Sequence, residues 1–163
     1  GTLISLSKNK EIILGMADIP ALDERYIGHS KLSYKISNSK RTGLKVRKTV
    51  ELRDSILNTT SPYVFANKYD QKIFERLAND VKTVRLGGDC YSYCLLADGH
   101  IDIVLESGLK PWDIRALEPI ITNAGGILKT WEGNKVLNGG RIIATTNKVL
   151  FKKIKKKINK KPS

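Results

Sequence analysis

The chain has 163 residues and a mass of 18.2 kDa, a length typical of one domain. Hydrophobic residues make up 40% and charged residues 28%, which excludes a disordered or collagen-like chain. The formal net charge is +13, and because 21 of the 29 basic residues precede Lys148, residues 1–147 carry only +5. Apolar runs such as Ile12-Ile13-Leu14 are far too short to span a membrane, so we expect no membrane partner.

The first third of the chain has the patterning of antiparallel strands. Apolar, β-prone segments alternate with turn residues, and Pro20 closes the second segment. The predicted strands are residues 2–7, 11–19 and 24–28. The polar, basic residues 29–48 predict a loop over a sheet edge, and residues 50–57 predict a further strand before the turn cluster at 58–62.

From residue 63 the pattern changes to alternating helices and strands. The predicted helices are residues 68–79, a helix from Cys90 to Gly99 with Asp89 as its N-cap, residues 113–124, and a basic helix from Lys148. The predicted strands are residues 83–86, 101–106, 127–131 and 141–145. The fold class is therefore α/β, a layered α+β sandwich in which a partial antiparallel sheet precedes a second sheet flanked by helices. We expect domains at 1–62 and 63–163.

The C-terminal segment indicates which binding partners the chain could have, and the cysteines indicate its cellular compartment. An apolar stripe of Leu150, Phe151, Ile154 and Ile158 predicts that the basic helix docks on the core, with its lysines on the other faces. An anionic partner on this helix is the alternative, but no aromatic or arginine interleaves the lysines, which disfavours nucleic acid. Cys90 and Cys94, at helical spacing, fit two small apolar residues in a reducing, cytoplasmic compartment.

Two stretches carry residues suited to chemistry. Glu106 ends a strand, and Asp113 begins a helix seven residues later, where free N–H groups keep a carboxylate ionised and able to bind a hard cation. Gly87 and Gly88 precede the helix of Cys90 and expose backbone donors to an anion. Each stretch also has an ordinary structural interpretation, since Asp is a common N-cap and two glycines are a common strand–helix turn.

Three runs stand out: Gly-Gly-Asp-Cys-Tyr-Ser-Tyr-Cys-Leu-Leu-Ala-Asp-Gly at 87–99, Leu-Lys-Pro-Trp-Asp-Ile-Arg-Ala-Leu-Glu-Pro at 109–119, and Asn-Ala-Gly-Gly at 123–126. Together they resemble the inositol monophosphatase superfamily, most closely its histidinol-phosphate phosphatase branch. The resemblance implies a Mg²⁺-dependent phosphomonoesterase in which a metal-activated water attacks a small phosphate monoester. It makes Asp113 a catalytic metal ligand and Glu106 a contact for substrate hydroxyl or amino groups. It places Gly88, Asp89 and Cys90 along the leaving-group pocket.

The chain departs from the family pattern in its metal ligands. The family's other ligands lie upstream, on a Glu and on an Asp-Pro-Ile-Asp-Gly-Thr-like loop, and this sequence contains neither. We therefore expect a fragment of a homodimeric enzyme that by itself binds Mg²⁺ weakly or not at all and is inactive. The alternatives are a phosphatase for inositol or other sugar phosphates, and a non-catalytic module that binds an anionic partner through its basic helix.

Overall fold

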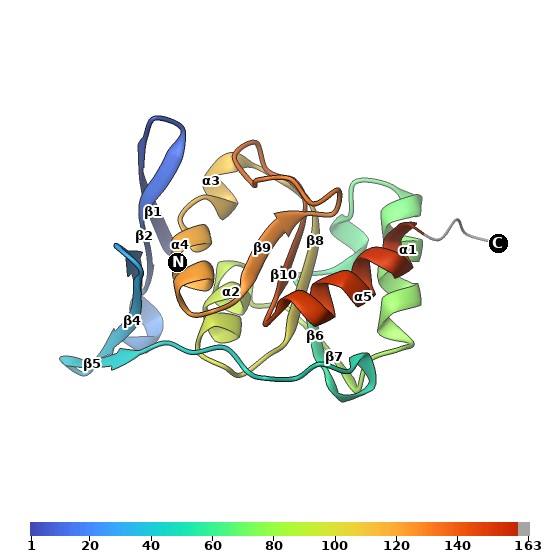
Figure 1. Cartoon of the computed structure of the whole chain (residues 1–163), viewed down its shortest axis with the longest axis horizontal. Coiled ribbons are helices and arrows are strands. Elements are labelled where there is room, and N and C mark those ends of the chain that lie inside the picture. The colour runs from blue at the N-terminus through green and yellow to red at the C-terminus, as the bar shows by residue number, and fades with distance from the viewer. Residues whose placement is uncertain (160–163) are drawn as a thin grey trace.

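The computed structural model describes residues 1–159, apart from the side chain of Val64. It has four layers: a five-stranded sheet, three helices, a second five-stranded sheet, and two more helices on its far face (Figure 1). The predicted α/β sandwich with two sheets and flanking helices is confirmed. No helix within residues 1–159 is long and apolar enough to cross a membrane.

The first sheet is antiparallel throughout, in the order β1-β2-β3-β4-β5. Its strands are β1 Thr2–Lys8, β2 Glu11–Ile19, β3 Glu24–His29, β4 Leu32–Ser37 and β5 Lys40–Gly43. The prediction of a loop over 29–48 is therefore wrong for β4 and β5. Both are entered through tight turns without glycine, Ser30-Lys31 and Asn38-Ser39, whose positive φ angles the sequence did not signal.

The second sheet has the order β7-β6-β8-β10-β9. Its strands are β6 Ile56–Thr59, β7 Thr83–Leu86, β8 Ile103–Leu109, β9 Ile127–Thr130 and β10 Gly140–Thr145. β6 runs parallel to both β7 and β8, so its carboxyl end meets that of β8 at one edge. The strand predicted at 50–57 begins later, because a 3-10 turn occupies Leu52–Asp54. β6 belongs to this sheet, while the domain division at residue 62 stays a prediction.

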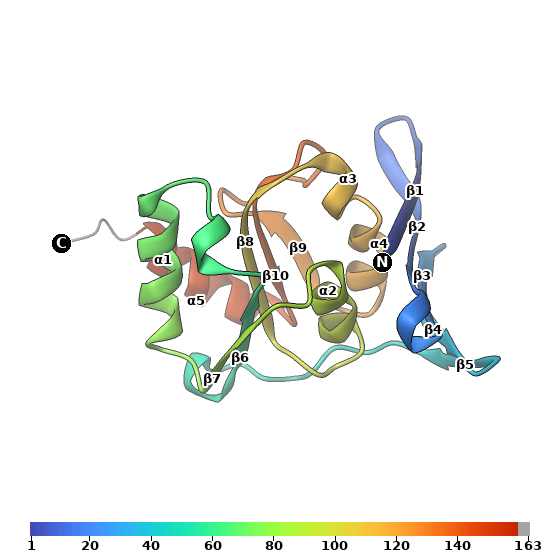
Figure 2. The ribbon, with the colours of Figure 1, turned by 180° about the vertical axis from the view of Figure 1, so that it is seen from behind.

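The second sheet separates two apolar cores, and helices cover both. The helices α2 Cys90–Ala97, α3 Pro111–Ile114 and α4 Leu117–Asn123 lie between the sheets, and α1 Lys68–Ala78 and α5 Lys148–Asn159 cover the outer face (Figures 1 and 2). The apolar stripe of α5 packs on the outer core as predicted: Leu150, Ile154 and Ile158 are buried and Phe151 is half-buried. Lys160 and Lys161 lie outside the described residues.

The helix predicted at 113–124 is two helices with a break at Arg115 and Ala116. The four apolar residues predicted to face inward, Leu117, Ile120, Ile121 and Ala124, are all buried. Pro119 lies in the first turn of α4, where a backbone N–H has no partner inside the helix. The proline therefore breaks no backbone hydrogen bond of α4, whereas in the middle of one long helix it would remove one and destabilise the helix.

Helix α4 lies directly on the first sheet because two strand glycines allow it. A Cβ atom on Gly15 would lie 1.8 Å from the carbonyl oxygen of Ala116, and one on Gly28 would lie 2.4 Å from the backbone nitrogen of Ile120. Any side chain larger than hydrogen would push the helix backbone away from the strands. These two contacts fix the position of α4, and through the short connection they fix α3 as well.

Candidate active site

Glu106 lies near the carboxyl end of β8 and is almost fully buried, with 2% of its surface exposed. Its carboxylate accepts hydrogen bonds from the backbone N–H of Thr60 at 2.6 Å and from the hydroxyl of Thr59 at 3.3 Å. Burial raises the pKa of this carboxyl, the two threonines oppose that rise, and the charge of Asp89 adds to it. The net effect is a pKa above the usual value.

The raised pKa of Glu106 predicts a pH-dependent effect of Glu106→Gln on stability. The native state holds this proton more tightly than the unfolded chain, so the wild type loses stability as pH rises through the raised pKa. Gln keeps an acceptor for Thr60 and has no proton to lose. Urea unfolding at about pH 4.5 and about pH 7 should show the variant gaining stability relative to the wild type at the higher pH. An equal difference in unfolding free energy between variant and wild type at both pH values would contradict a raised pKa for Glu106.

Asp113 is the third residue of α3 and is half-buried. Its carboxylate accepts a hydrogen bond from the backbone N–H of Lys110 at 2.7 Å, which holds the side chain over the start of the helix. The sequence predicted Asp113 in the first turn of a helix, and this is confirmed. Because α3 has only four residues, the local hydrogen bond rather than a long helix dipole fixes the carboxylate.

The segment before α2 has a conformation that requires glycine. Gly87 and Gly88 have φ angles of +84° and +100°, and a Cβ on Gly88 would lie 2.4 Å from the hydroxyl oxygen of Ser92. Asp89 also has a positive φ, 47°, and its side chain makes no capping hydrogen bond to α2. Asp89 therefore occupies the N-cap position of α2, as predicted, but its side chain does not cap the helix amides. The exposed carboxylate stays available for other contacts.

Cys90 begins α2 and is buried, with 8% of its surface exposed. Burial raises the pKa of its thiol, and the neighbouring charge of Asp89 raises it further. The side chain is therefore a neutral thiol at neutral pH, suited to lining a pocket rather than to acting as a nucleophile.

The charges of Glu106, Asp89 and Asp113 all act on the buried hydroxyl of Tyr93. Tyr93 lies on α2, and its pKa is raised first by burial and then by the charges of Glu106, Asp89 and Asp113. Its hydroxyl has no hydrogen-bond partner among the described residues. Helix α2, which follows Asp89, and helix α3, which carries Asp113, lie on the same side of β8 (Figure 2). The charges of three acids that are up to 24 positions apart in the sequence thus act on the same buried side chain.

These residues do not by themselves fit a complete magnesium site. Within the described part of the chain, no group of three or more His, Cys, Asp or Glu side chains lies close enough together to hold a metal ion. Mg²⁺ prefers six oxygen ligands and takes one or two carboxylates together with waters and substrate phosphate. The role of Asp113 as one such ligand and the weak Mg²⁺ binding expected of the isolated chain both stay predictions.

Thr59 and Thr60 are site residues that the sequence analysis did not identify. They were assigned only to a turn, yet their hydroxyl and amide groups hold the carboxylate of Glu106. The contact exists because β6 pairs in parallel with β8, Asn58 lying opposite Val104. The two segments are 46 positions apart along the chain, so no local pattern could have indicated the pairing.

Comparison with known proteins places the chain in a family. The family model of the inositol monophosphatase family matches residues 1–163. The chloroplastic bifunctional phosphatase IMPL2 of Arabidopsis thaliana is 41% identical over 84% of this chain and 38% of its own length. The histidinol-phosphatase of Mycobacterium tuberculosis is 30% identical over 97% of this chain and 61% of its own length. The chain thus spans less than two thirds of these relatives.

A solved structure gives the same result at the level of the fold. An inositol monophosphatase from Zymomonas mobilis superposes with a TM-score of 0.87 at 34% sequence identity, over 96% of this chain and 61% of that one. The match includes both sheets and the helices between them, since it extends over nearly all of the chain. From the family model and this superposition together, the chain belongs to the inositol monophosphatase family.

Proposed function

We propose that this chain forms the leaving-group side of the active site of a Mg²⁺-dependent phosphomonoesterase, one that hydrolyses histidinol phosphate or a similar small polar ester. The family consists of phosphatases that are generally Mg²⁺-dependent, which supports the reaction class. The observation that carries the proposal is the buried carboxylate of Glu106 near the carboxyl end of β8, held by Thr59 and Thr60, in a strand that leads directly to Asp113 in the first turn of α3. In α/β sheets ligands collect at such carboxyl ends of strands.

In this proposed active site, Asp113 binds the metal. A bound Mg²⁺ would neutralise phosphate charge and activate a water for attack on phosphorus. The other ligands would come from carboxylates outside these 163 residues, because Asp113 alone cannot form the site. The hydrogen bond from Lys110 keeps one carboxylate oxygen occupied and orients the other.

The acidic residues beside Asp113 favour a leaving group that carries positive charge. Glu106 is held in place by Thr59 and Thr60, and Asp89 leaves its carboxylate exposed beside the glycine turn. An ammonium or imidazolium group would donate charge-assisted hydrogen bonds to these two acids, whereas the neutral hydroxyls of inositol would donate weaker ones. The similarity to a protein named histidinol-phosphatase agrees with this choice. An inositol or other sugar phosphate is the alternative substrate.

The substrate assignment predicts a selective effect of Glu106→Gln on the full-length protein. We expect kcat/KM for histidinol phosphate to fall about 10-fold to 100-fold, because the hydrogen bond from the cationic leaving group loses the negative charge of its acceptor. The value for inositol 1-phosphate should change less. Steady-state phosphate release with both substrates in parallel measures the difference. An equal loss on both would contradict a role for Glu106 in selecting the leaving group.

The remaining predictions about partners stand without a test. The cytoplasmic location and the homodimer stay predictions, and the relative from Arabidopsis thaliana is described as chloroplastic. The alternative of an anionic partner along the later turns of α5 has little support, because three of the lysines there contact the chain itself. Lys153 pairs with Glu51, Lys157 pairs with Asp80, and Lys155 donates to the carbonyl of Glu132.

A further inference from the structure

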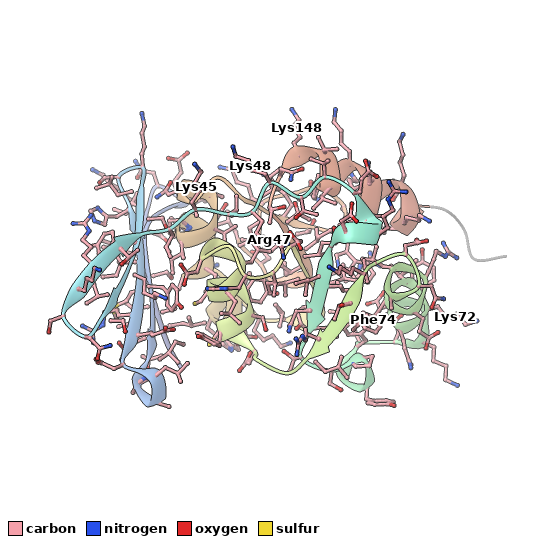
Figure 3. The ribbon with its side chains drawn as sticks, turned by 90° about the horizontal axis from the view of Figure 1, so that it is seen from below. Lys45, Arg47, Lys48, Lys72, Phe74 and Lys148 are labelled. Atoms are coloured by element: carbon pink, nitrogen blue, oxygen red, sulfur yellow. The ribbon has the colours of Figure 1, made fainter. Side chains whose placement is uncertain are left out.

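A groove with only basic charges crosses the molecule away from the candidate active site. It lies where the segment joining the two sheets passes the start of α5, and its volume is about 460 Å³. Four cationic side chains line it, Lys45, Arg47, Lys48 and Lys148, and no acidic residue does. Lys45, Lys48 and Lys148 lie along the upper edge in Figure 3, whereas Lys72 lies apart from them at the right-hand end of the molecule.

The walls of this groove are fixed by hydrogen bonds to the body of the protein. The backbone N–H of Val46 donates to the carbonyl of Ala124 at 3.1 Å. The side-chain amide of Asn147 donates to the carbonyl of Thr49 at 2.7 Å. The joining segment is therefore held at both ends of the groove, and a ligand would meet a surface that is already ordered.

The charges in the groove are largely uncompensated. Arg47 is the exception, because its guanidinium pairs with the buried carboxylate of Asp102 at 3.3 Å. We therefore assign Arg47 a structural role. Lys45, Lys48 and Lys148 are exposed and make no ion pair with any residue from 1 to 159. They differ in this from Lys153 and Lys157 of α5, which are paired.

Aliphatic side chains stand among these ammonium groups. Val50 and Val149 line the groove and are 44% and 47% exposed. The side chain of Asn147 already accepts the N–H groups of Val149 and Leu150, so the helix end offers few donors and the lysines supply the positive charge. No aromatic residue lines the groove, which leaves nothing for nucleic-acid bases to stack on.

We propose that this groove binds an extended acidic segment of a partner polypeptide. Its carboxylates would pair with Lys45, Lys48 and Lys148, and its aliphatic side chains would cover Val50 and Val149. Charge complementarity and the exposed valines both favour this ligand over a nucleic acid. The proposal is independent of the phosphatase activity, because none of these residues belongs to the candidate active site.

The test is fluorescence anisotropy with the full chain and a labelled peptide of alternating acidic and aliphatic residues. Matched peptides carry Gln for each acid or Ser for each aliphatic residue, and a uridine oligonucleotide of equal length is the nucleic-acid probe. The triple variant Lys45→Gln, Lys48→Gln, Lys148→Gln should bind the acidic peptide at least about tenfold more weakly. A control triple with the same charge loss at exposed sites elsewhere, Lys40, Lys72 and Lys156 to Gln, should bind within about twofold of the wild type.

A second variant separates binding from folding. Val149→Asp puts a carboxylate in the first turn of α5, where it favours the helix, but in the groove it repels acidic peptides. We expect unchanged or higher thermal stability together with peptide affinity reduced more than about fivefold. Failure of the wild type to bind the acidic peptide would overturn the proposal. So would an equal loss in the control triple, tighter binding of the oligonucleotide, or sedimentation showing that the three lysines instead hold two copies of the chain together.

Discussion

Asp113→Asn in the full-length protein should lower turnover by more than about 100-fold, since losing a metal ligand costs more than losing an outer-shell partner of one. The amide can still accept the hydrogen bond from Lys110, so α3 should keep its position. What is lost is the negative charge that draws Mg²⁺. Steady-state kinetics over a range of Mg²⁺ concentrations should show low turnover that added metal restores only in part.

The matched control is Asp54→Asn, which removes an equal charge from an exposed 3-10 turn. Its turnover should equal that of the wild type. If Asp113→Asn keeps near-normal turnover at all Mg²⁺ concentrations, Asp113 is not a metal ligand and the proposed site is wrong.

Gly15→Ala should destabilise the fold by about 3 kcal/mol or more, at the upper end for an overpacked core. The added Cβ would lie 1.8 Å from the carbonyl oxygen of Ala116, and a backbone atom cannot move aside by a change of rotamer. Relief requires α4 to shift away from β2. Urea unfolding followed by circular dichroism measures the loss.

Gly43→Ala is the matched control, because a Cβ there would meet nothing within 4 Å. It should change stability by less than about 0.5 kcal/mol. Equal stability of Gly15→Ala and Gly43→Ala would show that α4 does not lie against the first sheet as described.

The layered fold could be predicted because most elements carry local signals. The stripe of α5, the glycine turn before α2 and the inward residues of α4 follow from spacing alone. β4 and β5 could not, because their turns use Ser, Lys and Asn where a glycine would have marked them. The break between α3 and α4 could not be predicted, because apolar residues recur at helical spacing across 113–124. Only Pro119 indicated an interruption.

The sequence pointed to candidate site residues but not to their contacts. Asp113 and Glu106 were identified from the ends of elements and from the family resemblance. The hydrogen bonds from Thr59 and Thr60 depend on a parallel pairing between distant strands, which leaves no trace in local sequence. Asp89 is the N-cap residue that the sequence predicted, but its positive φ and the missing capping hydrogen bond left no signal in the sequence.

The most direct test of the proposed function is phosphate release by the full-length protein from histidinol phosphate and inositol 1-phosphate, with Mg²⁺ and with EDTA. The account predicts release that requires Mg²⁺ and a higher kcat/KM for histidinol phosphate. Release from neither ester in the presence of Mg²⁺, with the protein folded, would contradict it.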